Sequence, residues 1–222
     1  SDFIKHSGSS IVVGRQEGSH IHSAIPSADG RFLYVSDLGI DKIMIYKVDE
    51  NGKLTPADVP FSISSSGSGP RHFTIHPNGK FAYSAEEISS TVASFRVNKK
   101  NGALNPIERL DMLPKGFTEK NSAADIHFSP DGKFLYASNR GHESLVIYKA
   151  NSRNGKLTLV GHEGTGGKHP RNFMIDKNGE FALTGNQNTD NIVIFRRDKQ
   201  TGKLMPTGDQ VMVPAVTCLI QL

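Results

Sequence analysis

The sequence predicts an all-β fold of the β-propeller class, built from four repeats of one four-stranded blade. The same residue pattern recurs around Gly30, Gly79, Gly132 and Gly179, with a period of roughly fifty residues, inside the range typical of propellers and solenoids. Each copy has two tight turns that end in glycine, and the segments between them are rich in β-branched and aromatic residues. A two-sheet sandwich would explain short strands but not this fixed repeat.

Within one repeat, the strands follow in a regular order. The first is a short apolar run such as His72–Ile75. An Asp-Gly or Asn-Gly turn, a strong hairpin signal, leads to the second strand, which is Phe32–Ser36 in the first copy. A polar turn precedes the third strand, Lys42–Val48, and Asn51-Gly52 turns into a fourth that begins Lys-Leu-Thr-Pro. The other second strands are predicted at Phe81–Ala85, Phe134–Ser138 and Phe181–Gly185.

These repeats predict one propeller domain over residues 1–222, with blades at approximately 20–68, 69–121, 122–168 and 169–213. Residues 214–222 read as a closing strand, and Ser1–Ser19 as the tail of an earlier repeat with one possible strand. The domain is therefore expected to be incomplete at its N-terminus. Apolar blade faces would then be covered by missing N-terminal blades or by self-association.

Composition excludes several classes of partner. The formal net charge is +4, but Lys and Arg are spread over turns and form no basic stripe with aromatic residues, so nucleic acid is not expected as a partner. No apolar stretch is long enough to span a membrane. The one cysteine, Cys218, excludes a disulfide framework and indicates a reducing, cytoplasmic compartment. Because the chain starts at Ser1, the sequence leaves a signal peptide open.

Positions where the four copies differ are candidates for function. One slot lies eight residues before the turn glycine, at the start of the innermost strand, and holds His22, Arg71, Ala124 and Arg171. A second slot lies eight residues after that glycine and holds Leu38, Glu87, Arg140 and Gln187. The slot just before it holds Asp37, Glu86, Asn139 and Asn186. Such variation in charge is typical of one asymmetric site on a symmetric scaffold.

The residue types in these slots suit the hydrolysis or formation of a lactone. His22 and Glu87 can move protons near neutral pH, and Arg71 and Arg171 can hold carboxylate or phosphate oxygens in bidentate fashion. We expect these four residues to converge on one end of the central channel. Structural alternatives remain: the arginines could pair with carboxylates of a neighbouring blade, His22 could be a structural histidine, and Glu87 could be a solvated carboxylate.

No metal or organic cofactor is expected. Asp125 and His127 lie two residues apart on one strand face, but no third ligand at useful spacing accompanies them. The run Gly164–Gly167 lacks the Gly-Lys-Ser/Thr ending of a phosphate-binding loop.

Several stretches resemble the seven-bladed lactonase propellers of the 6-phosphogluconolactonase type, which are related to the fungal muconate-lactonizing enzyme. The matching stretches are Arg15–His22, Gly30–Gly39, Gly69–Phe73, Ala124–Gly132, Asn139–His142 and Asn186–Asn188. The resemblance covers essentially the whole chain and implies that about three further blades precede it. It implies a cofactor-free enzyme of carbohydrate metabolism that hydrolyses a small anionic lactone, namely a phosphorylated sugar lactone.

The resemblance also implies residue roles. His22, Arg71, Glu87 and Arg171 occupy the motifs that carry the family's catalytic His, Glu and two Arg. We expect His20, Asp125, Arg140 and Asn186 to bind substrate. His20 lies two residues from His22 and competes with it for the catalytic role, and Glu86 beside Glu87 departs from the Asn-Glu pair of the family.

Two other functions remain open. A cycloisomerase acting on a muconate-like dicarboxylate would use the same residues, because two guanidinium groups suit one phosphate or two carboxylates equally. A non-catalytic propeller that binds a partner should expose aromatic residues at its loop tips. Trp is absent and the Phe and Tyr residues fall mainly within strands, which makes this third function the least favoured.

Overall fold

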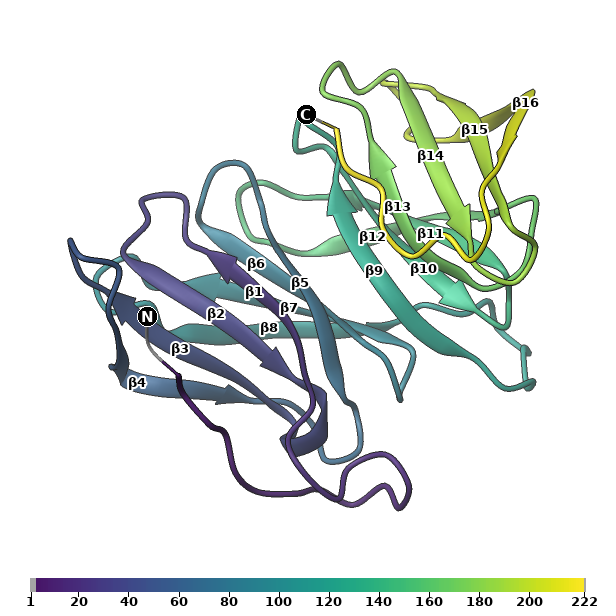
Figure 1. Cartoon of the computed structure of the whole chain (residues 1–222). Coiled ribbons are helices and arrows are strands. Elements are labelled where there is room, and N and C mark those ends of the chain that lie inside the picture. The colour runs from purple at the N-terminus through teal and green to yellow at the C-terminus, as the bar shows by residue number, and fades with distance from the viewer. Residues whose placement is uncertain (1–2, 222) are drawn as a thin grey trace. The chain divides into compact units, whose positions relative to one another are not determined.

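The computed structural model describes residues 3–221 as four antiparallel sheets of four strands each, in sequence order (Figure 1). The first two sheets are β1 (Ile21–Pro26), β2 (Phe32–Asp37), β3 (Lys42–Val48), β4 (Leu54–Ile63) and β5 (Pro70–Ile75), β6 (Phe81–Glu86), β7 (Thr91–Val97), β8 (Leu104–Asp111). The last two are β9 (Ser122–Phe128), β10 (Phe134–Arg140), β11 (Ser144–Ala150), β12 (Leu157–Gly164) and β13 (Pro170–Ile175), β14 (Phe181–Asn186), β15 (Asn191–Arg197), β16 (Leu204–Met212). The predicted four-stranded blades and their second strands are confirmed.

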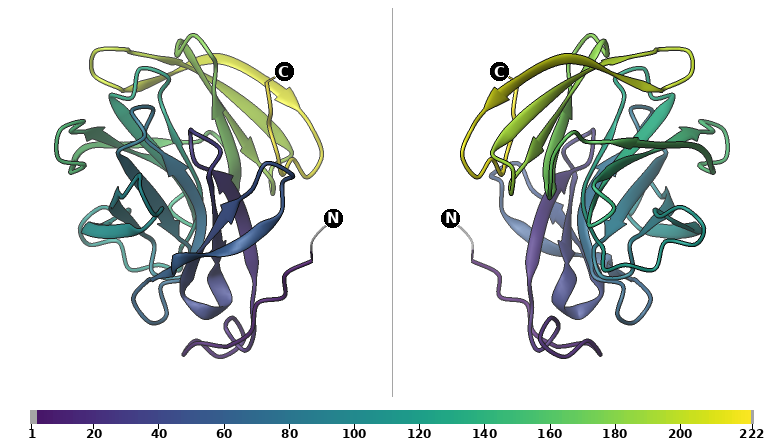
Figure 2. Two further views of the ribbon diagram at one scale, coloured as in Figure 1. Left: turned by 90° about the vertical axis from the view of Figure 1, so that its left-hand side faces the viewer. Right: turned by 90° about the vertical axis from the view of Figure 1, so that its right-hand side faces the viewer.

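The chain divides into two compact units, and the division falls between Leu110 and Asp111. The N-terminal unit contains the first two sheets and the C-terminal unit the last two, which can be followed separately in Figure 2. Every sheet lies inside the range predicted for its blade. Whether the whole chain is one propeller domain stays a prediction.

A hydrophobic core lies between the two sheets of each unit. In the N-terminal unit this core includes Phe32, Tyr34 and Ile43 from the first sheet and Phe73 and Phe95 from the second. The Tyr34 and Phe73 rings lie 5.2 Å apart between centroids. The C-terminal unit repeats the arrangement with Phe134, Tyr136, Leu145, Phe173 and Phe195. Full burial of one such side chain stabilises the fold by about 2 kcal/mol, so the large apolar residues of the repeat account for sheet-on-sheet packing.

The turn between the first two strands is more specific than a two-residue hairpin. Gly30 has a φ of 71°, but Asp29 before it does not have a positive φ. The amide of Gly30 donates to Ser27 O at 2.9 Å, and the amide of Ser27 to Phe32 O at 2.8 Å, which encloses a four-residue turn with glycine in the left-handed position. In the second blade the Asn78 side chain accepts from the amide of Lys80 at 2.9 Å. The Asp or Asn therefore acts through its side chain, not through a positive φ.

A left-handed residue precedes the third strand of every blade. Asp41, Ser90, Glu143 and Asp190 have φ values of 53°, 56°, 53° and 55°. Asp41 follows the one short 3-10 helix, η1 (Leu38–Ile40), and its carboxylate accepts from the amides of Gly67 and Gly69, both at 2.7 Å. A positive φ is costly for residues other than glycine, and these hydrogen bonds to the loop after the fourth strand offset that cost in the first blade.

The predicted strands at the two ends of the chain do not form. Residues 3–20 contain turns but no strand, and residues 213–221 contain none either; Ser1, Asp2 and Leu222 lie outside the described residues. The C-terminal segment is instead held by side chains: Ala215 N donates to Asp190 Oδ1 at 2.7 Å, and Leu219 N to Asn172 Oδ1 at 2.6 Å. These side-chain acceptors take the amides that a strand ladder would have used.

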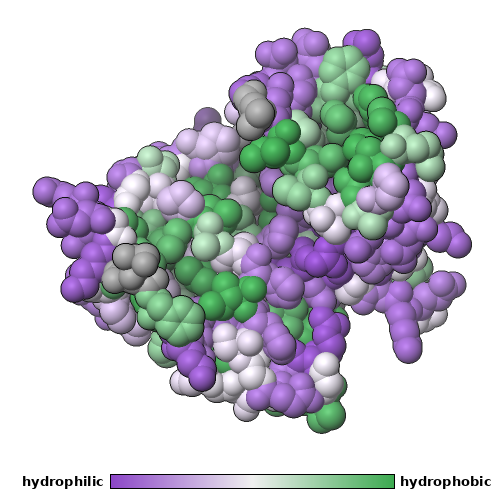
Figure 3. Space-filling view, in the orientation of Figure 1, coloured by the Kyte–Doolittle hydropathy of each residue, from purple (hydrophilic) through white to green (hydrophobic). Residues whose placement is uncertain are grey.

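Apolar side chains are exposed near both ends. In the N-terminal unit Phe3, Val13 and Ile21 are exposed, as are Val211 and Met212 on the last strand of the C-terminal unit. Figure 3 shows apolar residues gathered on the visible face of each unit. These faces agree with the expected open blade surfaces, while the nature of what covers them stays a prediction. No helix among residues 3–221 has the length and apolarity needed to cross a membrane.

Candidate functional site

The first slot of differing residues coincides with a β-bulge. The pairing between the first two strands of a blade shifts register between Ile21 and Ser23, between Pro70 and His72, and between Pro170 and Asn172. His22, Arg71 and Arg171 are the residues at these irregularities. A bulge re-aims a side chain and is common next to active sites, so the fold gives these three residues an orientation that a regular strand would not.

Arg71 belongs to an ion cluster in the N-terminal unit. Its Nε lies 2.7 Å from Oε2 of Glu87, and both side chains are almost fully buried, with exposed fractions of 4% and 6%. The other carboxylate oxygen of Glu87 accepts a hydrogen bond from Nη2 of Arg15, whose side chain is 47% exposed. One carboxylate is thus held between a buried and an exposed guanidinium group, and the three groups together carry a net charge of +1.

The two adjacent glutamates have different environments. Glu86 is fully buried and accepts from the Thr91 hydroxyl at 2.6 Å and from Nε and Nη2 of Arg109 at 2.6 and 2.9 Å. The corresponding residues Asp37, Asn139 and Asn186 are also fully buried. This slot is therefore part of the interior of every blade. Glu87 is the carboxylate that belongs to the cluster reaching solvent.

The next candidates are two histidines at the start of the first sheet, His20 just before β1 and His22 within it. His20 and His22 are both exposed. The backbone amide of His20 donates to Asp37 Oδ1 at 2.7 Å, which fixes the entry into β1. The hydroxyl of Ser23 donates to the carbonyl oxygen of Arg71 at 2.9 Å, which joins β1 to β5. His22 and Arg71 are consequently on neighbouring innermost strands.

In the C-terminal unit, Arg171 has the same position on β13 but no carboxylate. The backbone amide of Gln187 donates to His169 O at 3.0 Å, as that of Glu87 does to Gly69 O at 2.7 Å, so the two loops are equivalent. Gln187 replaces the glutamate. Arg171 is half-buried, and its guanidinium makes no hydrogen bond or ion pair with any of residues 3–221. The alternative in which it pairs with a neighbouring carboxylate is not observed.

The other three expected substrate-binding residues are buried in the C-terminal unit. Nη2 of Arg140 donates to Ala123 O at 2.7 Å, and Nδ2 of Asn186 to Thr165 O at 3.0 Å. Asp125 accepts from Nδ2 of Asn172 at 2.5 Å and lies 2.9 Å from Nε2 of His127. These contacts favour structural roles, although Oδ1 of Asn186 has no hydrogen-bond partner within residues 3–221. Their contact with substrate, and the convergence of the four catalytic candidates on one channel, stay predictions.

The Asp125 carboxylate and the His127 imidazole lie within hydrogen-bonding distance of each other. Burial acts to lower the pKa of the His127 imidazole, but the Asp125 carboxylate and its hydrogen bond outweigh burial and raise it above the ordinary value. Within residues 3–221, no group of three or more His, Cys, Asp or Glu side chains is arranged to hold a metal ion.

Arg15 is the site residue that sequence reasoning missed. It lies in an irregular segment before the first repeat, so a comparison of the four copies has no slot for it. The only sequence signal was its place at the start of the stretch Arg15–His22, which resembles the lactonases.

Comparison with known proteins agrees with this architecture. A family model described as "Lactonase, 7-bladed beta-propeller" matches residues 1–221. The chain belongs to this lactonase family. It is 44% identical over 179 residues to a 6-phosphogluconolactonase of Formosa agariphila, a match that covers 79% of this chain and 50% of that protein. It is 36% identical over 162 residues to the 6-phosphogluconolactonase of Bacillus subtilis, covering 73% of this chain and 46% of that one.

Two solved structures superpose closely on this chain. A protein from Lactobacillus plantarum has a TM-score of 0.91 at 37% identity and covers 97% of this chain and 62% of its own. The periplasmic gluconolactonase PpgL of Pseudomonas aeruginosa has a TM-score of 0.89 at 36% identity, with coverages of 95% and 59%. The predicted propeller fold is confirmed. The chain spans about half the length of the curated relatives that it matches.

Proposed function

We propose that this lactonase hydrolyses the ring ester of a phosphorylated sugar lactone, and that Arg71, Glu87 and Arg15 form part of its active site. The observation that carries the proposal is the single carboxylate held between a buried and an exposed guanidinium group. A buried ion is costly unless it is paired. Glu87 pairs with the buried Arg71 and also binds Arg15, whose positive charge lies at the surface. The names of the relatives, 6-phosphogluconolactonase and gluconolactonase, support a sugar lactone as substrate.

The reaction needs three things: a base for water, stabilisation of an oxyanion, and a grip on an anionic substrate. In our proposal the imidazole of His22 takes a proton from water as the water oxygen bonds to the lactone carbonyl carbon. The carbonyl oxygen becomes an oxyanion, which the positive charge of the cluster stabilises. The carbon–oxygen bond of the ring then breaks, the proton passes from His22 to the leaving oxygen, and a hydroxy acid results. The part that Arg171 of the C-terminal unit takes in this reaction stays a prediction.

We also place the protein in the cytoplasm. Cys218 is a free, exposed thiol, and free thiols persist in reducing compartments.

The test is hydrolysis of 6-phosphoglucono-δ-lactone, followed as acid release against the spontaneous rate. Arg71→Lys should lower kcat/KM on the order of 100-fold, because Lys does not reproduce the guanidinium geometry. Arg153→Lys is the matched control, since Arg153 is exposed on a turn of the C-terminal unit and belongs to none of the slots of differing residues. His22→Gln and His20→Gln form a second pair, of which only the first should abolish turnover. A folded chain that does not exceed the spontaneous rate would overturn the proposal.

A further inference from the structure

Arg15 uses only part of its hydrogen-bonding capacity. Nη2 donates to Oε1 of Glu87, and no other hydrogen bond of the guanidinium is present among residues 3–221. A guanidinium has five N–H donors in a fixed planar fork. Since the side chain is 47% exposed, the remaining donors are available to a ligand in solution.

The segment that carries Arg15 is ordered although it has no regular secondary structure. The amides of Arg15 and Gln16 both donate to Val12 O, at 3.1 and 2.9 Å. Gln16 is fully buried; its Nε2 donates to Leu38 O at 2.7 Å, and its Oε1 accepts from Val12 N at 3.2 Å. The backbone of Arg15 is therefore held by this turn, and its guanidinium group by Glu87. A held side chain loses less conformational entropy when a ligand binds.

Glu17, the carboxylate nearest to Arg15 in the sequence, bonds to a backbone amide. Glu17 accepts a hydrogen bond from the amide of Gly14, and that bond is the main reason that the pKa of Glu17 lies below its usual value. Its charge is thereby committed to the same turn. Glu87 is shared with Arg71, so the pair of arginines exceeds the carboxylate by one positive charge.

We propose that Arg15 anchors the phosphoryl group of the substrate and so determines the preference for a phosphorylated over an unphosphorylated sugar lactone. This inference rests on the function proposed above. Arg71 lies beneath the surface and Arg15 at it, so the cluster offers positive charge at two depths. The inner charge suits the oxyanion that forms at the lactone carbonyl, and the outer one a group at the far end of the substrate. A guanidinium fork matches two phosphoryl oxygens at once.

The experiment measures binding of the two stable products, 6-phosphogluconate and gluconate, to the 222-residue chain by titration calorimetry at fixed ionic strength. The wild-type chain should bind 6-phosphogluconate about tenfold more tightly than gluconate, the effect of one charge-assisted contact. Arg15→Ala should reduce this ratio to about one. Arg15→Lys should retain an intermediate ratio, because it keeps the charge but not the fork. Arg153→Ala is the control and should leave the ratio unchanged.

The outcomes separate this inference from the proposed function. A ratio that Arg15→Ala leaves unchanged, or a wild-type chain that binds neither product, overturns the role of Arg15, even if the chain hydrolyses lactones. A ratio that depends on Arg15 in a chain without lactone hydrolysis supports the phosphoryl anchor and overturns the hydrolase. Circular dichroism of both Arg15 variants checks that an altered ratio does not come from unfolding.

Discussion

The two units differ at the end of the third strand of their second sheets. An arginine fills the space there in the C-terminal unit, and the same space is open in the N-terminal unit. In the C-terminal unit Arg197 ends β15 and is almost fully buried. It donates from Nε to the Tyr136 hydroxyl at 2.9 Å and from Nη1 to Gly179 O at 2.8 Å. Its Nη2 lies 3.3 Å from Oδ1 of Asp131. One side chain thus joins the turns of both sheets of its unit.

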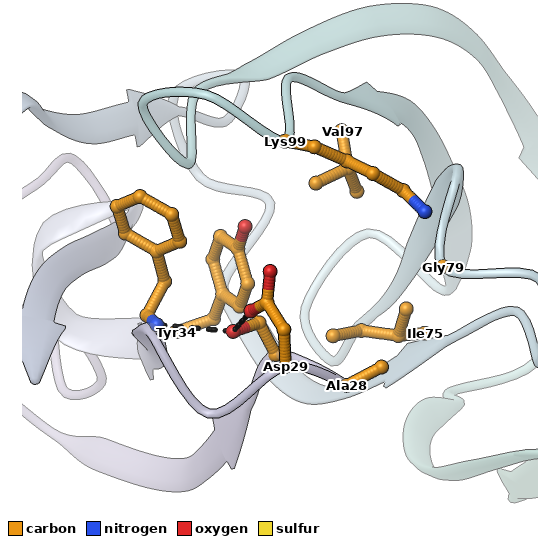
Figure 4. Close-up of a pocket in the computed structure, with 9 residues that line it drawn as sticks. Ala28, Asp29, Tyr34, Ile75, Gly79, Val97 and Lys99 are labelled. Carbon is orange, nitrogen blue, oxygen red and sulfur yellow. Dashed lines mark hydrogen bonds between the residues drawn. The ribbon is translucent and has the colours of Figure 1, made fainter.

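In the N-terminal unit the equivalent residue is Val97, and a cavity of about 60 Å³ lies where the guanidinium would be. Figure 4 shows Asp29 and Tyr34 facing Ile75 across this cavity, with Lys99 and Val97 along its other side. Asp29 pairs instead with Arg31, whose Nε and Nη2 donate to it at 2.9 and 2.8 Å. The Ser27 hydroxyl first, and then Arg31, hold the pKa of Asp29 at about 2 against the effect of burial.

The innermost strands show the reverse distribution. There the N-terminal unit has a complete ion cluster around Glu87, whereas the C-terminal unit leaves Arg171 without a carboxylate. The order of the strands and the positions of the main core residues correspond in the two units, so neither the turn nor the strand start requires a particular charge. We infer that the residues that differ at the strand start serve function, and that those that differ at the turn serve stability.

The largest expected effect comes from making the C-terminal turn resemble the N-terminal one. Arg197→Val removes the donor that Tyr136, Gly179 and Asp131 share, and breaking a buried pair costs about 3 kcal/mol of unfolding free energy. Hydrogen exchange of the β13–β16 amides should accelerate, while exchange in β5–β8 stays unchanged. Arg196→Val is the control, because Arg196 is exposed and only stacks on Phe181. If the Arg197→Val variant shows the same hydrogen-exchange protection as the wild type, the hydrogen bonds of Arg197 are not needed for the stability of the C-terminal unit.

The opposite exchange sharpens the same comparison. Val97→Arg combined with Arg31→Lys copies the C-terminal arrangement, in which Lys133 stands at the position of Arg31. Burial raises the pKa of both Tyr34 and Tyr136 to about 12, so both hydroxyls remain protonated and can accept an arginine Nε–H through oxygen. Filling the cavity should stabilise the N-terminal unit by about 1 kcal/mol. Destabilisation of this double variant would mean that the cavity has a shape the guanidinium does not fit.

Exchanging glutamate and glutamine between the equivalent positions 87 and 187 should change the free energy of unfolding by a smaller amount. Glu87→Gln removes the negative charge that lies 2.7 Å from Nε of the buried Arg71 but keeps an acceptor oxygen, so we expect the N-terminal unit to lose about 2 kcal/mol. Gln187→Glu gives the half-buried Arg171 a partner and should stabilise the C-terminal unit by less than about 1 kcal/mol. Urea unfolding followed by hydrogen exchange reports on each unit. Equal responses of the two units would contradict the assigned difference in burial.

The fold could be predicted from the sequence because each local signal for a strand or a turn occurs in all four copies of the repeat. The turn glycines, the alternating large residues and the strand order all agreed, and the second strands formed where predicted. The prediction of strands in the terminal segments was wrong, because the apolar runs of these segments lie outside the repeat. Val216 is buried against the last sheet without pairing as a strand, since the amides around it bond to side chains such as Asn172.

The site was predictable only where it lies inside the repeat. Aligning the copies selected Arg71, Glu87 and Arg171 because equivalent positions hold different charges. The alignment could not show the bulges, which are a property of strand pairing, nor the full burial of Glu86 beside Glu87. Arg15 reaches Glu87 across 72 positions of sequence, and no local pattern reports a contact of that range.

The smallest effect is a pH dependence that the first sheets of the two units do not share. His127 in β9 pairs with Asp125, whereas the equivalent residue of β1 is Ile25. Because the folded pKa of His127 is raised, its stabilising contribution is fully present below the ordinary histidine value of about 6.5. The contribution is lost as pH rises through the folded value. Hydrogen exchange in β9–β12 should therefore show protection that weakens above neutral pH, and His127→Gln should remove this dependence. His20→Gln, at an exposed histidine, should not. A pH profile unchanged by His127→Gln would mean that another group carries the dependence and that the contact between His127 and Asp125 does not stabilise the sheet.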